Sequence, residues 1–225
     1  MKSREIQWDT VFGRILIISI PLMIICIAAN ITMRMPDTYQ YSLSDSQILN
    51  SAPVVVDEGK LVNLFGDYMQ HKTNDFTLKE SVDYKPEDVF NDKDRAAMHH
   101  LRTALDIVLA VGIIALIMTA VCYFFLIRWR RKVIHMEYLK KSFLMFLIMS
   151  VLWALAKAVP FFRSLTWGHL LGSGFKTGDI LIMVLQDKFS LQVTVFDLVI
   201  SFVIMGILAY GTWEVAGRKK MFKRR

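Results

Sequence analysis

The stretch ILIISIPLMIICIAANITM, residues 15–33, decides the class of fold, because it contains no charged side chain. A second uncharged run covers residues 107–127, and residues 142–162 contain a single charge, Lys157. Residues 192–215 contain only Asp197 and Glu214. About 18 or more consecutive apolar residues are long enough to cross the hydrocarbon core of a bilayer. The sequence therefore predicts four transmembrane helices.

The first run also has the basic start of a secretory signal peptide. Its apolar part is longer than the usual signal-peptide core, and no small-x-small cleavage site follows it in AANITMRMPDTY, residues 28–39. We therefore expect a retained helix. Hydrophobic residues make up 54% of the whole chain, which is high for a soluble domain and agrees with a polytopic membrane protein.

The distribution of charge predicts the orientation in the membrane. Residues 128–141 carry six basic side chains and one acidic one, and six of the last eight residues are basic. Residues 31–102 instead carry twelve acids and eight bases. Lys and Arg accumulate in cytoplasmic loops, so both termini and the central loop are expected in the cytoplasm. The positive charge borders the apolar runs, where it suits anionic lipid, so nucleic acid is not an expected partner.

The region between the first two apolar runs is predicted to form a small extracytoplasmic cap. SAPVVVDEG, residues 51–59, is typical of a strand and turn, and KLVNLFGDYMQ, residues 60–70, has helical apolar spacing. FTLKESVDYK, residues 76–85, favours a strand or an extended arm. Asn91 or Asp92 is a plausible N-cap of a helix that continues into the second span.

The expected fold class is an all-α polytopic membrane protein with four transmembrane helices and a small mixed α/β extracytoplasmic cap. The cap is expected to be too small to bury much core alone. The predicted segments are residues 1–33 (N-terminus and helix 1), 34–98 (cap), 99–128 (helix 2), 129–141 (basic loop), 142–162 (helix 3), 163–191 (outer loop) and 192–225 (helix 4 and basic tail).

Neither metal nor cofactor chemistry is suggested by the sequence. The only cysteines, Cys26 and Cys122, lie inside apolar runs and are expected to pack as small hydrophobic side chains. No phosphate-binding glycine loop, zinc-ligand spacing or serine triad is present. No cofactor is expected, and the oligomeric state stays open.

Polar side chains at the outer ends of the predicted spans are the candidates for a site. Histidine both accepts and donates protons near neutral pH, and arginine stabilises oxyanions or headgroup phosphates. His99 and His100 point about 100° apart on a helix, so at most one faces a given site, and His100 is favoured. Lys157 is expected to pair with Asp197 across helices. The full set also includes Arg34, Asp37, Tyr39, Arg102, Arg163, His169, Lys176 and Asp179.

Four blocks together resemble the bacterial lipoprotein intramolecular transacylase family. They are MRMPDTYQY (33–41), KLVNLFGDYM (60–69), VFNDKDRAAMHHLR (89–102) and GDILIMVLQDKFS (178–190). The resemblance covers most of the chain and implies four spans and an outer cap. The family has a histidine at the position of Ala97 and a second one near Arg163. His100 lies three residues beyond Ala97, on nearly the same helix face, and His169 is the nearest substitute for the second histidine.

The resemblance implies an enzyme that moves an acyl chain within a lipoprotein, from the diacylglyceryl ester to the amine of the N-terminal cysteine. No cofactor or metal is needed, and the partners are membrane lipid and the lipidated protein N-terminus. His100 is the expected base and His169 a second proton-transfer group. Arg34, Tyr39, Arg102 and Arg163 are the expected substrate contacts.

Two other functions remain open. A non-catalytic member of the same family would bind lipid, lipoprotein or a membrane partner without turnover, and the absence of both family histidines favours this alternative. A small transporter is disfavoured, because the spans lack paired broken helices and charges at the membrane midplane.

Overall fold

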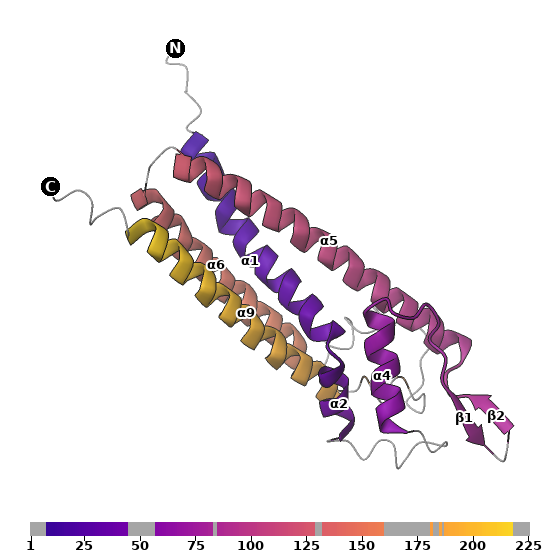
Figure 1. The fold of residues 1–225 in the computed structure, drawn as a ribbon. Coiled ribbons are helices and arrows are strands. Elements are labelled where there is room, and N and C mark those ends of the chain that lie inside the picture. Colours follow the sequence, from indigo (N-terminus) through magenta and orange to yellow (C-terminus); the bar gives the residue numbers. More distant parts are fainter. Residues whose placement is uncertain are drawn as a thin grey trace. The chain divides into compact units, whose positions relative to one another are not determined.

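The computed structural model describes residues 8–44, 57–82, 85–128, 132–159, 181, 185 and 187–217 (Figure 1). The chain divides into two compact units. We call Met1–Ala28, Val108–Trp153 and Leu198–Arg225 the membrane unit. We call Ala29–Ile107 and Ala154–Asp197 the cap unit.

Four long helices are each long and apolar enough to cross a membrane, which confirms the four predicted spans. Their portions within the membrane unit run side by side, and the start of the first and the end of the last lie at the same end of that unit (Figure 1). The second helix continues without interruption from the predicted cap into the span, as expected. The helices are α1 (Trp8–Arg34), α5 (Asp92–Arg128), α6 (Lys132–Ala158) and α9 (Asp187–Gly217).

The membrane unit is joined by apolar packing and by a few hydrogen bonds between helices. Thr119 on α5 donates its hydroxyl to Ser19 on α1 at 3.0 Å, and both side chains are buried. Ser142 on α6 donates to the Leu16 carbonyl at 3.0 Å. Small residues and buried hydroxyls join helices in lipid, where apolar side chains gain little from leaving hydrocarbon. The buried apolar cluster is Leu16, Ile20, Met23, Ile24, Ala115, Cys122, Leu126, Leu139, Phe146 and Met205.

The cap unit contains two shorter helices, α2 (Pro36–Ser44) and α4 (Glu58–Met69). Strands β1 (Lys79–Val82) and β2 (Lys85–Asp88) pair antiparallel, with Lys79 opposite Asp88. Within the described residues, these two strands form the regular β structure, and they make no sheet layer. The prediction of a mixed α/β cap was therefore wrong, because the cap is mainly helical. The physical reason is that helices and loops, and not a sheet, supply most of the side chains of the cap core.

Helix α4 confirms the helix predicted from the apolar spacing of residues 60–70. Asp57 caps it, because its carboxylate accepts from the Lys60 backbone N–H at 3.2 Å. Of the strand expected over residues 51–59, residues 51–56 lie outside the described part of the chain. The remaining three residues form the N-cap and first turn of α4.

Helix α5 begins with a reciprocal capping arrangement. The Asn91 amide oxygen accepts from the backbone N–H groups of Lys93 and Asp94, at 2.8 and 3.0 Å. The Asp94 carboxylate in turn accepts from the Asn91 backbone N–H at 3.1 Å. Two orphan backbone donors of the first turn are thereby satisfied, and the N-cap is Asn91.

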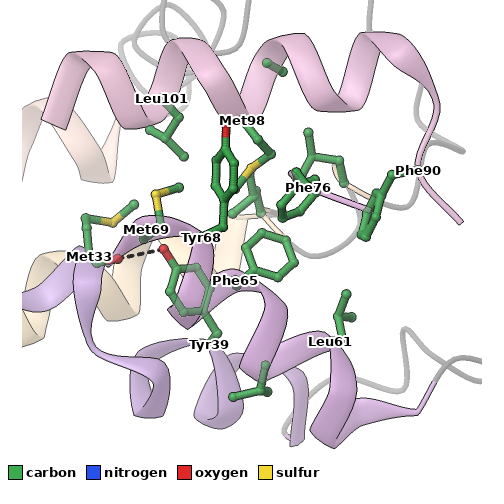
Figure 2. Packing of buried hydrophobic residues seen from close by; sticks show 14 of the residues in the cluster. Met33, Tyr39, Leu61, Phe65, Tyr68, Met69, Phe76, Phe90, Met98 and Leu101 are labelled. Atoms are coloured by element: carbon green, nitrogen blue, oxygen red, sulfur yellow. Dashed lines mark hydrogen bonds between the residues drawn. The ribbon is translucent and has the colours of Figure 1, made fainter. Parts of the chain in front are cut away.

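The core of the cap unit is unusually aromatic (Figure 2). Tyr39 stacks on Phe65 with ring centroids 5.0 Å apart, and Phe65 meets Phe76 edge-to-face at 5.2 Å. Met98 and Leu101 of α5 close the cluster (Figure 2). Aromatic pairs of this geometry contribute about 0.5–1.5 kcal/mol beyond the burial of their area, so rings replace the larger core that a cap of this size lacks.

The end of α1 is held by side chains from the cap elements. Thr38 donates to the Thr32 carbonyl at 2.8 Å. The Tyr39 hydroxyl donates to the Met33 carbonyl at 2.7 Å (Figure 2). Gln70, which follows α4, donates to the carbonyl of Arg34 at 2.8 Å. The last carbonyls of a helix have no partner within it, so these three bonds satisfy them and fix the backbone that carries Arg34.

Candidate functional site

A cluster of charged and polar side chains lies where the apolar segments begin and end. Arg34 is the last residue of α1, and Asp106 directly precedes the uncharged run that starts at Ile107. Arg34 Nη2 donates to Asp106 Oδ1 at 2.6 Å, and its Nε donates to Asn30 Oδ1 at 3.2 Å. The Arg34 side chain is 21% exposed and that of Asp106 is 41% exposed, so the pair is partly desolvated but open to a ligand.

A histidine completes this cluster, and it comes from the loop after α4. His71 Nε2 lies 2.9 Å from Asp106 Oδ1, and Arg102 Nε donates to His71 Nδ1 at 3.0 Å. Arg102 Nη2 also contacts Nδ1. A guanidinium has donors only, so Nδ1 carries the lone pair and Nε2 carries the proton that it donates to Asp106. These partners therefore fix a neutral imidazole in one tautomer.

Arg102 itself is held in place by neutral groups. Its Nη1 donates to the Thr73 carbonyl at 3.2 Å, and its guanidinium carbon lies 4.7 Å from the centroid of the Tyr68 ring. With a neutral His71, the four side chains Arg34, His71, Arg102 and Asp106 have a net charge of +1. The cluster is therefore suited to an oxygen that carries or develops negative charge.

The backbone of His71 adopts a conformation that normally belongs to glycine. Its φ is 61°, and among the described residues His71 is the non-glycine residue with a positive φ. His71 N–H donates to the Tyr68 carbonyl at 3.2 Å and Lys72 N–H to the Asp67 carbonyl at 2.9 Å, which is the Schellman pattern at a helix C-terminus. Glycine is the usual residue at this position, and another residue costs about 1–2 kcal/mol there. Strain of this kind concentrates at functional sites.

Two of the predicted substrate contacts, Arg34 and Arg102, lie in this cluster. A third, Tyr39, is fully buried, and its hydroxyl donates a hydrogen bond to the Met33 carbonyl, which supports the end of α1. Burial raises the pKa of the Tyr39 phenol, and the Arg34 charge lowers it by a smaller amount. The phenol therefore keeps its proton and its hydrogen bond at neutral pH.

His100, the predicted base, and the neighbouring His99 are both exposed on α5, and neither takes part in the cluster. Ala97 is buried in the core cluster of the cap unit. Arg163 and His169 lie outside the described residues. The predicted pair of Lys157 and Asp197 is also untested, because the Lys157 side chain lies outside the described part, although Asp197 is buried.

His71 and Asp106 were not anticipated as site residues. One feature of the sequence could have indicated His71: a histidine stands two residues after a helix with a clear apolar face, residues 58–69, where glycine is usual. Within the described residues, no group of three His, Cys, Asp or Glu side chains has the arrangement of a metal site.

The fold and the cluster define a class: a multi-pass membrane protein with a histidine–carboxylate pair and two arginines at the ends of its apolar helices. The model of the family "lipoprotein intramolecular transacylase Lit" matches residues 14–170, and the chain belongs to this family. Among curated protein sequences, none matches the chain significantly.

Solved structures of one such transacylase share the fold. The integral membrane transacylase Lit from Bacillus cereus matches with a TM-score of 0.72 and 14% identity, over 97% of this chain and all of that one. A histidine-to-alanine variant of the same protein matches with a TM-score of 0.71 and 15% identity, over 96% of each chain. A histidine-to-arginine variant gives a TM-score of 0.68 at 15% identity, over 96% of this chain and 95% of that one.

Proposed function

We propose that this protein is an enzyme that transfers an acyl chain within membrane lipoproteins, with His71 as its proton-transfer group. One observation supports the proposal above the others. His71 is bound to Asp106 in a fixed tautomer, beside two arginines, at the boundary of the apolar segments. A carboxylate that orients an imidazole, together with cationic groups for an oxyanion, is a recurrent arrangement for acyl transfer.

The proposed step balances without a cofactor. The amine nitrogen of the lipidated N-terminal cysteine forms a bond to the ester carbonyl carbon, and the bond from that carbon to the glyceryl oxygen breaks. The proton lost by the amine passes to His71 Nδ1 and then to the glyceryl oxygen. Asp106 stabilises the imidazolium between these two transfers. An ester thereby becomes an amide within one molecule.

The arginines have separate tasks in this proposal. Arg34 is paired with Asp106 and holds that carboxylate in position. Arg102 stabilises the oxyanion that forms on the ester carbonyl. His169 stays a proposed second proton-transfer group and Arg163 a proposed headgroup contact. His100, which is exposed, is retained as an alternative base that the same experiment tests.

The proposed orientation has both termini in the cytoplasm and the cap unit outside the bacterial cytoplasmic membrane. The basic central loop and tail support it. The native cysteines are both buried, so single cysteines introduced for labelling are well resolved from them. Labelling of Lys72→Cys from outside intact cells supports this orientation, and labelling of a tail cysteine under the same conditions contradicts it.

A second candidate is a non-catalytic family member that binds lipid or lipoprotein. The burial of Ala97 in the cap core, at the position of the family histidine, favours it. In this case Arg34 and Arg102 would hold a headgroup without turnover.

The test is expression in a bacterium that lacks such activity, followed by mass spectrometry of lipoprotein N-termini. The enzyme proposal predicts an acyl chain on the cysteine amine with the native chain and with His99→Ala, and none with His71→Ala. If acyl transfer persists in His71→Ala and is lost in His100→Ala, His100 is the base. Diacyl forms that stay unchanged with native protein present in the membrane favour the binding candidate.

A further inference from the structure

We infer that Arg102 gates the site: it covers the lone pair of His71 in the resting protein and uncovers it only when an anionic or developing anionic oxygen draws the guanidinium away. This inference rests on the proposed function for the identity of the substrate. Its physical basis is that both ring nitrogens of His71 already have hydrogen-bond partners and that the partners of Arg102 are neutral.

Both ring nitrogens of His71 are occupied. Nε2 faces Asp106 Oδ1 at 2.9 Å, and Nδ1 faces the guanidinium of Arg102, with Nε at 3.0 Å. An imidazole takes up a proton only at the nitrogen with a free lone pair. In this arrangement that nitrogen is covered by a cation, so His71 is oriented for base catalysis but cannot act as a base.

The cation that covers it has no anionic partner within the described residues. Arg102 contacts the Thr73 carbonyl, the Tyr68 ring and the His71 nitrogen, all of which are neutral. Arg34 differs, because its guanidinium is paired with Asp106 at 2.6 Å. Pairing with an anion adds a direct attraction between opposite charges, which the neutral partners of Arg102 do not supply. An incoming anionic oxygen therefore competes well for Arg102 and poorly for Arg34.

Release of Arg102 needs only a side-chain movement. The residue lies one turn before Asp106 on the continuous helix α5, so its backbone stays fixed while the guanidinium moves. The guanidinium then stabilises the oxyanion that it has bound, and Nδ1 becomes free at the same moment. Arg102 thus acts on proton transfer through His71, and the base is exposed only when the reacting oxygen is in place.

Carbethoxylation of histidine tests the gate without turnover, because diethyl pyrocarbonate reacts with uncovered imidazole nitrogens. Peptide mass spectrometry compares the rate at His71 with the rates at His99 and His100, which are exposed to solvent as His71 is. His71 differs from them in the arginine that contacts its Nδ1. The gate predicts slow reaction at His71 in the purified full-length protein in detergent. It predicts an increase of about tenfold or more in Arg102→Ala, the effect of losing one charge-assisted hydrogen bond.

Arg95→Ala is the matched control. Arg95 lies on the same helix, but it pairs with Asp88 at 2.9 Å and Asp92 at 3.4 Å, away from His71. The gate predicts an unchanged rate at His71 in this variant. Arg102→Gln, which keeps neutral donors, should give an intermediate rate if Arg102→Ala fails to fold. A rate at His71 that matches His100 in the native protein, or that does not change in either Arg102 variant, overturns the gate.

Two additions identify the source of the anionic oxygen. A diacylglyceryl-cysteine peptide that accelerates labelling of His71 in the native protein, but not in Arg102→Ala, identifies the substrate ester. Vesicles of phosphatidylglycerol that do the same identify a lipid phosphate. If neither accelerates labelling, the ligand-driven opening is wrong. Because these rates need no acyl transfer, an inactive protein can still show the gate, and an active protein can lack it.

Discussion

The membrane unit and the cap unit are stabilised in different ways. In the membrane unit, large apolar side chains point outward, such as Phe124 with 65% of its surface exposed, and the helices meet through buried hydroxyls and close packing. In the cap unit, Tyr39, Phe65, Tyr68, Phe76 and Phe90 are buried in one cluster, and Phe65 is completely buried. The difference agrees with lipid around the membrane unit and water around the aromatic cluster of the cap unit, because water drives aromatic rings into a shared core more strongly than lipid does.

The two units also differ in chemistry. The four side chains of the candidate cluster belong to the cap unit. The hydrogen bonds between helices described in the membrane unit, Thr119–Ser19, Tyr123–Thr212 and Ser142–Leu16, join hydroxyls to each other or to a backbone carbonyl. The predictions below therefore test whether function and aromatic packing belong to the cap unit alone.

The largest expected effect separates function from stability within the cap unit. His71→Gly places glycine at the left-handed position, which relieves strain of about 1 kcal/mol, while it removes the proposed base. We expect acyl transfer, read by mass spectrometry of lipoprotein N-termini, to fall by about 10²–10⁴-fold. The thermal stability of the purified protein should be unchanged or higher. Loss of stability together with loss of activity would instead indicate a structural role for the imidazole.

The next prediction contrasts one phenylalanine from each unit. Phe65→Ala removes a fully buried ring that contacts Tyr39, Phe76 and Phe90, and should destabilise the cap unit by about 3–5 kcal/mol. Phe124→Ala removes an exposed ring in the membrane unit, and its cost should be within about 0.5 kcal/mol of zero. Hydrogen exchange of the α4 amides in detergent measures the first effect and should not respond to the second. Equal effects would contradict the assignment of solvents.

A smaller effect is expected at Tyr39, whose hydroxyl satisfies the Met33 carbonyl. Tyr39→Phe should destabilise the cap unit by about 1 kcal/mol. Burial raises the pKa of this phenol, so its contribution is fully present below the unfolded pKa of about 10 and is lost as pH rises beyond that value. The native protein should therefore lose cap stability above about pH 10 more steeply than Tyr39→Phe, in hydrogen exchange or thermal melts compared at matched pH. Parallel pH profiles of the two proteins would show that burial does not raise the pKa of the Tyr39 phenol.

The smallest effect is expected at a hydrogen bond of the membrane unit. Ser19→Ala removes the acceptor of Thr119, and such bonds between transmembrane helices are worth about 0.6 kcal/mol on average. Chemical unfolding in mixed micelles is the measurement. If Ser19→Ala lowers the free energy of unfolding by several kcal/mol, polar contacts dominate the membrane unit and the contrast drawn with the cap unit is wrong.

The sequence determined the features that depend on local composition. Runs of apolar residues long enough for a bilayer predicted all four spans, because every backbone group within lipid must be paired inside its own helix. Apolar spacing predicted α4, and Asn91 or Asp92 was predicted as the N-cap of α5, which the structure assigns to Asn91. Arg34 and Arg102, which the sequence singled out because both border apolar runs, lie in one cluster in the structure, and their contact with substrate stays a prediction.

Only the tertiary structure decided which imidazole joins that cluster. His71 lies thirty-one residues from Arg102 and thirty-five from Asp106, and it reaches them because a Schellman turn reverses the chain after α4. The adjacent histidines His99 and His100 were more conspicuous in the sequence, yet in the described structure neither side chain forms a hydrogen bond or ion pair with the cluster. Hydrophobic periodicity specifies which face of a helix is buried, whereas the partner of a polar side chain depends on how separate segments pack together.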